Sequence, residues 1–396
     1  MAGDLSLATA TSLVFTSLGA FAIPLLCRPL RVPPAVGEIL YGILVGPYLL
    51  HLVSVSRLIS QLAELGMLLL MFTAGLEIDF RSLEEAGKGP VVQAAVRSVV
   101  VIVTAQVLAW VMGWPPFLGL VLGVISIGVL LGVLQELKMM KSSLGQELLL
   151  MGSLGEFFSI VIATGVNAHE EANGLNWAFL LQFSQLGLVF ALAWVVLVVL
   201  RLSVWWKAEA FSRLVETHDS SEVGVRAGMA LMFIFVAVAS ALHIEPILGA
   251  FMAGALFAFV FRDRGALELK FLSLGNGFFV PVFFIAVGLR FELPALWTSD
   301  FLLFFQMLGA VLITRLVPVF LFGGSGPQGW AGALLLSCPL TLMVVFADLG
   351  VRLELIASDF RSTLVLLAVS TSVLFPFIAR ALLSKSMTST GTPFTN

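Results

Sequence analysis

Long apolar runs alternate along this chain with short segments rich in charged residues, glycine and proline. A helix needs about 20 apolar residues to cross the hydrocarbon core of a bilayer, and most of these runs have that length. The pattern therefore predicts an all-α chain of about thirteen transmembrane helices. Their expected ranges are 5–27, 34–52, 58–76, 90–112, 116–134, 145–167, 177–200, 223–242, 246–261, 267–289, 298–322, 328–349 and 361–383.

Composition narrows the class of protein. Hydrophobic residues make up 59% of the chain and charged residues 11%, which leaves too little polar surface to cover a soluble globule. The first apolar run follows Asp4 rather than a basic region, so we expect a mature spanning helix and no cleaved signal. The net charge of −3 and the scattered basic residues indicate no nucleic-acid partner. Cys27 and Cys338 lie far apart in or beside apolar runs, and we expect no disulfide.

Basic residues gather in alternate loops, which predicts the orientation of the chain. One set of loops holds Arg28, Arg31, Arg81, Lys88, Lys138, Lys141, Arg201, Lys207, Arg213, Arg262, Arg264, Lys270, Arg380 and Lys385. The other set holds only Arg57, Arg290, Arg352 and Arg361. Because loops rich in Lys and Arg stay in the cytoplasm, we expect the N-terminus outside and the C-terminus in the cytoplasm.

Two pairs of segments indicate an internal repeat. The sequence PAVGEILYG at 34–42 is similar to PILGAFMAG at 246–254, and GLEIDF at 75–80 is similar to GLRFEL at 288–293. The offsets, 212 and 213 residues, are nearly equal, and an odd number of crossings separates equivalent helices. The chain is thus expected to be a single transmembrane domain with two repeats of opposite topology and no soluble regulatory domain. The predicted parts are repeat one at 5–167, a linker helix at 177–200 and repeat two at 223–383.

Secondary transporters with inverted repeats bind their substrates near the membrane midplane, on interrupted helices. The run at 116–134 contains several glycines, among them Gly128, and its repeat counterpart contains Ser337 and Pro339. Proline inside a helix removes a hydrogen bond and clashes with the preceding turn. Both runs are therefore predicted to break in mid-membrane, although small residues also serve simply to let helices pack closely.

Glu156 is the only charged residue between Leu148 and Val166, near the middle of a predicted span. Burying a carboxylate there is costly, which makes it a candidate functional residue with a partner to be found. Arg315, in the run at 298–322, is the expected charge partner, either in transport or as a purely structural salt bridge. Ser153, Ser126 and Thr341 are expected to add hydroxyl oxygens for an alkali cation bound at Glu156.

Four segments resemble the signature segments of the monovalent cation:proton antiporter-2 family, which includes Kef-type potassium efflux systems and NapA-like sodium/proton antiporters. They are PAVGEILYGILVGP at 34–47, LAELGMLLLMFTAGLEIDF at 62–80, PILGAFMAGALFA at 246–258 and FFVPVFFIAVGL at 278–289. The resemblance implies an NhaA-like inverted-repeat fold and a homodimer, in which a mobile ion-carrying core domain moves against a dimerisation domain. The family has an acidic pair, or Asn or Gln followed by Asp, where this chain has Gly155 and Glu156. Arg315 matches the family's basic residue, and Ile125 stands where a threonine is common.

These features together predict exchange of Na+ or K+, or alternatively Li+, for protons by alternating access, with no cofactor. With one titratable acid, the simplest cycle exchanges one cation for one proton and is electroneutral. The expected location is a bacterial inner (cell) membrane. Three alternatives remain: a sodium-coupled carrier of a small organic anion bound by Arg315, a cation channel, and a relative that no longer transports. An enzyme is not expected, because His169 and Glu170 lack the second histidine of a zinc protease motif.

Overall fold

A computed structural model describes most of the chain. The described ranges are 7–30, 32–78, 87–140, 142–171, 222–242, 244–260, 265–291, 300–322 and 326–390, with a few isolated positions between them. Within these ranges the secondary structure is helical and contains no strand, which confirms the all-α prediction.

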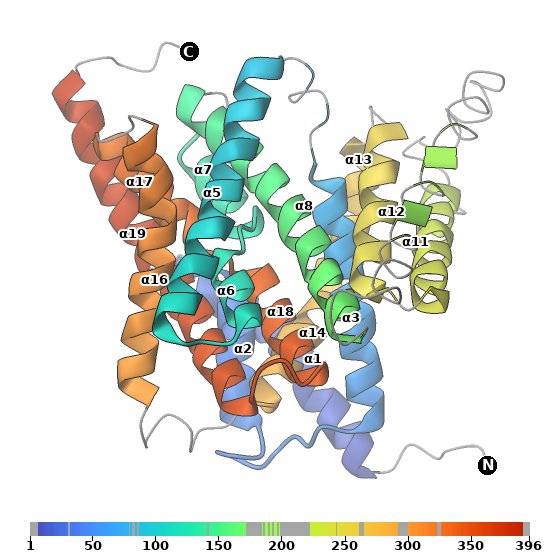
Figure 1. The fold of residues 1–396 in the computed structure, drawn as a ribbon. Coiled ribbons are helices and arrows are strands. Elements are labelled where there is room, and N and C mark those ends of the chain that lie inside the picture. The colour runs from blue at the N-terminus through green and yellow to red at the C-terminus, as the bar shows by residue number, and fades with distance from the viewer. Residues whose placement is uncertain are drawn as a thin grey trace. The chain divides into compact units, whose positions relative to one another are not determined.

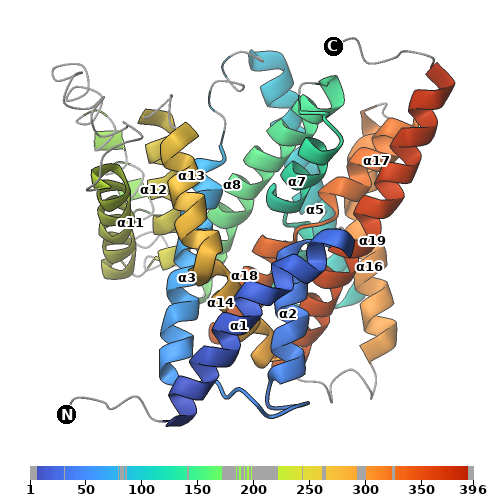
Figure 2. The same cartoon turned by 180° about the vertical axis from the view of Figure 1, so that it is seen from behind.

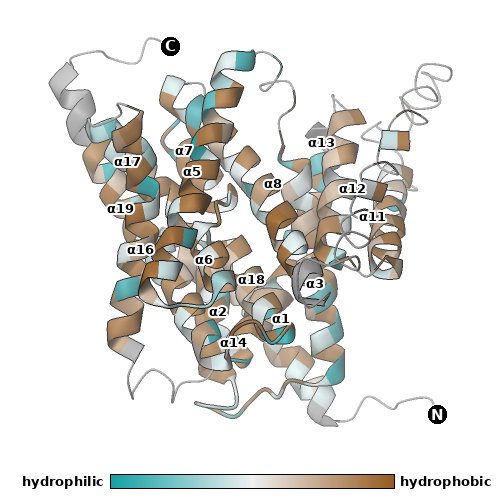
Figure 3. Ribbon diagram, viewed as in Figure 1, coloured by the Kyte–Doolittle hydropathy of each residue, from teal (hydrophilic) through white to brown (hydrophobic). Residues whose placement is uncertain are grey.

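Ten helical stretches in the described ranges are long and apolar enough to cross a membrane, and two shorter helices, Pro34–Val45 and Pro246–Val260, are also apolar. Figure 3 shows hydrophobic residues along most of each helix. The chain is therefore an integral, multi-pass membrane protein. The predicted linker helix at 177–200 lies mostly outside the described residues, so the count of thirteen helices stays a prediction.

The chain divides into two compact units, and each combines parts of both predicted repeats. Unit 1 comprises Met1–Cys27, Gly37–Arg81 and Ala163–Arg290, and unit 2 comprises Arg28–Val36, Ser82–Ile162 and Phe291–Asn396. All the candidate site residues predicted from the sequence belong to unit 2.

Eight helical elements lie wholly or mostly in unit 1. They are α1 (Leu7–Leu30, up to Cys27), α2 (Pro34–Val45, from Gly37), α3 (Arg57–Leu76), α11 (Val223–Ala241), α12 (Pro246–Val260), α13 (Gly265–Leu274), η1 (Gly275–Phe279) and α14 (Val280–Leu289). Helix α12 contacts both α3 and α11 (Figure 1). The predicted helix at 34–52 is shorter than expected: α2 ends at Val45, because the residue before Pro47 is disfavoured in a helix.

Four glycines of unit 1 form two equivalent crossings. A Cβ atom added to Gly75 would collide with the backbone of α12, and one added to Gly254 would collide with the backbone of α3. Likewise, a Cβ atom on Gly42 would collide with α14, and one on Gly288 with α2. In the sequence repeat Gly42 corresponds to Gly254, and Gly75 corresponds to Gly288. Glycines at equivalent positions of the two repeats thus form both crossings, as expected if the two halves are related by a pseudo-two-fold axis.

The predicted helix at 267–289 is not a regular α-helix. A π-helical turn, η1, separates α13 from α14, and its last hydrogen bond runs from the N–H of Val280 to the carbonyl of Gly275. Pro281 follows directly and cannot donate a backbone hydrogen bond, so a wider turn before it avoids a clash with the preceding carbonyl.

Unit 2 contains the two interrupted helices. Its elements are α5 (Lys88–Met112), α6 (Pro116–Gly123), α7 (Gly128–Glu136), α8 (Ser143–Glu171, up to Ile162), α16 (Asp300–Leu321), α17 (Pro327–Leu336), α18 (Leu340–Arg352) and α19 (Ser358–Thr390). Helix α16 contacts α5, α17 and α19 (Figure 2).

The core of unit 2 holds the first interruption in place. Buried side chains from α5, α7, α8, α17 and α19 pack into one cluster, and Ile125 and Ile127 of the interruption belong to it. Both isoleucines are at most 3% exposed. The non-helical backbone between α6 and α7 is therefore fixed by apolar packing on several sides.

Candidate ion site at the interrupted helices

Two predicted spans are each divided into half-helices. Helix α6 ends at Gly123 and α7 begins at Gly128, while α17 ends at Leu336 and α18 begins at Leu340. Ser337 and Pro339 lie in the second interruption. The half-helices contact one another, α18 with both α6 and α7, and α17 with α7. An interruption leaves backbone carbonyls and N–H groups without helical partners, and these must be satisfied by other groups inside a membrane.

Arg315 satisfies the carbonyl end of the first interruption. Its side chain, 1% exposed, donates hydrogen bonds to the carbonyls of Leu122 and Val124 at the end of α6. It also donates to Thr314 Oγ1 at 2.6 Å and to the carbonyl of Val311 at 3.4 Å. A guanidinium suits this place because it presents several donors and because the C-terminal end of a helix carries a partial negative charge.

Glu156 lies at the opposite end of the same interruption. The backbone N–H of Ile127, just before α7, donates to Glu156 Oε2 at 3.3 Å. The side chain is 2% exposed. The N-terminal end of a helix carries a partial positive charge, which favours a carboxylate. The first interruption thus has a basic group at its carbonyl end and an acidic group at its N–H end.

Two hydroxyl groups extend the polar site from Glu156. Ser126 directly precedes Ile127, whose N–H donates to Glu156, and Ser126 Oγ lies 2.7 Å from Thr341 Oγ1 at the start of α18. This bond joins the two interruptions. Ser153 is half-buried on α8, but among the described residues no hydrogen bond links it to this group. The Ser337 hydroxyl, just after α17, donates back to the carbonyl of Ala333 in that helix, at 2.8 Å.

The predicted direct pairing of Arg315 with Glu156 is not present. No ion pair within 4.0 Å joins these two described side chains, and the guanidinium instead contacts backbone carbonyls and Thr314. The reason is that the carbonyls at the end of α6 are themselves acceptors that need a donor in the membrane. The two charges face the same interruption and are joined through its backbone.

The interruption also explains why residue 155 is glycine. A Cβ atom at Gly155 would lie 2.8 Å from the Cβ atom of Ile125 and 2.7 Å from its Cδ1. Real Cβ contacts are longer, so any side chain at this position would push the interruption away from α8. Glycine therefore allows the backbone at Ile127 to reach Glu156.

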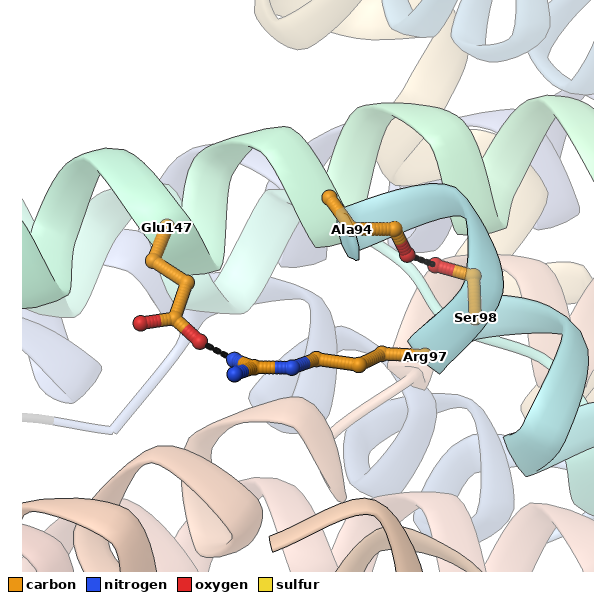
Figure 4. Close-up of polar contacts among 4 residues, drawn as sticks. All are labelled: Ala94, Arg97, Ser98 and Glu147. Carbon is orange, nitrogen blue, oxygen red and sulfur yellow. Dashed lines mark hydrogen bonds and ion pairs between the residues drawn. The ribbon is translucent and has the colours of Figure 1, made fainter. Parts of the chain in front are cut away.

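Polar contacts between α5 and α8 were not foreseen from the sequence. Arg97 of α5 forms an ion pair with Glu147 of α8 (Figure 4). Beside it, Ser98 donates to the carbonyl of Ala94 at 2.9 Å and to that of Met151, on α8, at 3.3 Å. These bonds tie the helix that carries Glu156 to its neighbour. The sequence does contain a signal for this contact, because Arg97 is a lone basic residue in an apolar run and such a residue requires a partner.

A helical membrane protein whose two interrupted helices meet beside a buried carboxylate has the architecture of secondary active transporters. Residues 14–385 match the model of the transmembrane sodium/hydrogen exchanger family. The chain belongs to this family, which confirms the resemblance to cation:proton antiporters.

Three relatives in other organisms show the extent of the similarity. The YbaL protein of Escherichia coli, provisionally named a cation/proton antiporter, is 30% identical over 97% of this chain and 70% of its own length. The YjbQ protein of Bacillus subtilis, provisionally named a Na+/H+ antiporter, is 27% identical over 94% of this chain. The Na+/H+-K+ antiporter GerN of Bacillus cereus is 25% identical over 87% of this chain and 88% of its own length. This chain spans 62% of the length of the Bacillus subtilis relative.

A solved structure shares the fold. The sodium proton antiporter MjNhaP1 from Methanocaldococcus jannaschii superposes with a TM-score of 0.64, over 97% of this chain and 98% of its own. The two sequences are 12% identical, so the similarity concerns the fold alone.

Proposed function

We propose that this protein exchanges a monovalent cation for protons across a membrane by alternating access, with Glu156 as the group that carries either one. The observation that supports this most is the position of Glu156, buried in unit 2 at the N–H end of an interrupted helix. The names of the relatives, which describe Na+/H+, cation/proton and Na+/H+-K+ antiporters, support the same substrates.

The exchange follows from competition at one carboxylate. A proton and an alkali cation both neutralise Glu156, so either binds only after the other has left. Arg315 stays charged and acts as a fixed positive group at the other end of the interruption. Each turnover then moves one cation in one direction and one proton in the other. The net charge moved across the membrane is zero.

Oxygen atoms around Glu156 supply the cation's remaining ligands in this proposal. Hard alkali cations prefer oxygen donors, and Ser126, next to the Ile127 N–H that binds the carboxylate, offers a hydroxyl oxygen. Na+, K+ and Li+ all suit such a set. Ser153 is a less favourable ligand, because no hydrogen bond places it with Ser126 in the described part of the chain.

The contacts of Arg315 speak against the alternative of an organic-anion carrier. An arginine that binds a substrate carboxylate needs a free pair of parallel donors. In Arg315 both terminal nitrogens already donate to backbone carbonyls. Releasing them would leave those carbonyls unsatisfied, at a cost of about 1–3 kcal/mol each.

The assembly and orientation are part of the proposal. We place the chain as a homodimer in a bacterial inner membrane, with its N-terminus outside and its C-terminus in the cytoplasm. The distribution of basic residues supports the orientation. The division into two compact units supports assigning the mobile, ion-carrying role to unit 2 and dimerisation to unit 1.

The test is a pH-gradient assay in proteoliposomes, with Na+, K+ and Li+ added in turn. Wild type should dissipate the gradient with at least one cation, and Glu156→Gln should not. Glu64→Gln is the matched control, because Glu64 is an exposed carboxyl of α3 in unit 1. A Glu156→Gln protein that exchanges as fast as wild type would falsify the proposal.

A second measurement on the same variants distinguishes a role of Glu156 in transport from a purely structural role. If the residue only ties α8 to the interruption, Glu156→Gln should lower the melting temperature and keep proton-coupled exchange. We expect the reverse, with folding retained and exchange abolished, because a neutral amide still accepts the Ile127 N–H bond.

A further inference from the structure

The carbonyl end of the second interruption has no hydrogen-bond donor in the described part of the chain. Helix α17 ends at Leu336. In a continuous helix the carbonyls of Leu335 and Leu336 would accept from the residues four positions later, 339 and 340. Pro339 has no N–H, and the N–H of Leu340 donates instead to the carbonyl of Cys338, at 2.8 Å. Leu335 and Leu336 are 1% and 4% exposed, so two buried carbonyls lack a partner among the described residues.

The equivalent end of the first interruption is satisfied by Arg315. With the repeat offset of 213 residues, Leu335 corresponds to Leu122, whose carbonyl accepts a hydrogen bond from Arg315. The same offset relates Arg315 to Ile102 of α5 in repeat one. An isoleucine side chain has no donor, so repeat one supplies no equivalent guanidinium. The first interruption thus has a fixed positive charge at its carbonyl end, and none of the described residues supplies one to the second.

We propose that the transported cation itself binds at the carbonyl end of the second interruption, with the backbone oxygens of Leu335 and Leu336 as ligands. This inference rests on the proposed function, since it names further ligands for the exchanged cation. The C-terminal end of a helix carries a partial negative charge, and hard alkali cations prefer oxygen ligands. Carbonyls inside a membrane need a partner. The cation supplies it at α17, as Arg315 does at α6.

The two interruptions are joined within unit 2. Helix α18 contacts α6 and α7, and α17 contacts α7. The hydrogen bond between Ser126 and Thr341 connects the start of α18 to the first interruption. Ser126 directly precedes Ile127, whose N–H binds Glu156. A cation at the carbonyl end of α17 therefore lies in the same group of packed half-helices as the carboxylate that neutralises it.

Pro339→Ala tests the proposal, because it adds the missing N–H, which can donate to the Leu335 carbonyl and compete with the cation. The measurement is the melting temperature of the full chain in detergent as Na+, K+ or Li+ replaces choline at constant ionic strength, since a ligand of the folded state stabilises it. We expect the half-maximal cation concentration to rise about tenfold or more, the scale for one lost contact to a charged group. Without these cations, the variant should melt at or above the wild-type temperature.

Pro376→Ala is the matched control. Pro376 lies inside α19, so alanine there also restores a backbone N–H, but outside both interruptions. Its half-maximal cation concentration should equal that of wild type. Pro339→Gly adds the same N–H with a lower helix propensity. If the alanine variant folds poorly, the glycine variant should show the increase instead.

An unchanged or lower half-maximal concentration in the Pro339 variants would overturn the cation site and leave these carbonyls to water. Equal increases in the Pro339 and Pro376 variants would overturn it as well, because the effect would then not depend on the interruption. The same holds if none of the three cations raises the wild-type melting temperature. Failure of the proposed function looks different: Glu156→Gln would keep proton-coupled exchange, whatever the proline variants show.

Discussion

Arg315 and Glu156 occupy the two ends of one interrupted helix, and each balances the partial charge of the half-helix end it contacts. At the scale of single residues, the site therefore depends on backbone groups as much as on side chains. Gly155 belongs to the same arrangement, since its missing side chain lets the interruption approach α8.

Gly155→Ala should weaken cation binding. The added methyl group would lie 2.7 Å from Ile125 Cδ1, so the interruption must move and lengthen the Ile127–Glu156 hydrogen bond. We expect a raised KM for the cation and a loss of about 1–3 kcal/mol in the free energy of unfolding. Transport assays and thermal unfolding in detergent measure both.

Gly165→Ala is the control for this change. Gly165 lies on the same helix, with no atom within 4 Å of an added Cβ. Alanine favours a helix over glycine by about 1 kcal/mol, so this variant should be as stable as wild type or more so. Equal KM values for the two alanine variants would contradict the role assigned to Gly155.

Arg315→Lys should be nearly as harmful as Arg315→Ala, although lysine keeps the charge. A single ammonium group cannot reproduce the two separate donors that reach the carbonyls of Leu122 and Val124. Each carbonyl left unsatisfied costs about 1–3 kcal/mol. We expect lower melting temperatures and reduced exchange in both variants. A lysine variant with wild-type stability would show that charge alone is sufficient.

At the scale of elements, helix packing in unit 1 depends on close contacts at glycines. In unit 2 it depends on hydrogen-bond partners for the backbone groups at the helix interruptions. The two glycine crossings join α3 to α12 and α2 to α14 by the same residues of the repeat. Close approach of small residues is a common means of helix association in membranes.

Alanine at either crossing should destabilise the protein to a similar degree. In Gly75→Ala and Gly288→Ala the new Cβ atom would meet backbone rather than a flexible side chain, so whole helices must separate. Gly309→Ala on α16 is the control, with no atom within 4 Å. Thermal unfolding should show large, similar decreases for the first two variants and none for the third. A decrease at only one crossing would argue against the symmetry.

At the scale of the whole molecule, the use of one carboxylate, Glu156, as the carrier determines the electrical behaviour of the proposed exchange. The described ranges contain no group of three or more His, Cys, Asp or Glu residues able to share a metal ion. With Glu156 as the sole carrier, each cation is matched by one proton.

The exchange rate should therefore be independent of membrane potential. Proteoliposomes with a clamped potassium diffusion potential of either sign should take up labelled Na+ at the same rate as those without one. Each elementary charge moved is worth about 2.3 kcal/mol per 100 mV, so an electrogenic cycle would respond clearly. A rate that rises with potential of one sign would exclude the one-to-one exchange.

The sequence by itself determined the features that depend on local composition. The bilayer fixes the length of an apolar run, and proline and glycine disturb a helix wherever they occur. The all-helical class and the positions of Gly128, Ser337 and Pro339 near interruptions follow from such local rules, whereas the family was indicated by the resemblance of four segments. The cost of a lone charge in the membrane likewise makes Glu156 stand out from its position in an apolar run alone.

Only the tertiary structure decided which groups satisfy one another. Ser126 and Thr341 are 215 residues apart in the chain and 2.7 Å apart in space. Arg315 contacts carbonyls of α6 instead of Glu156, and the Gly155 backbone leaves room for Ile125. A sequence reveals that a buried donor or acceptor needs a partner. Which partner it finds depends on how distant segments pack, since backbone groups compete with side chains for every hydrogen bond in the membrane.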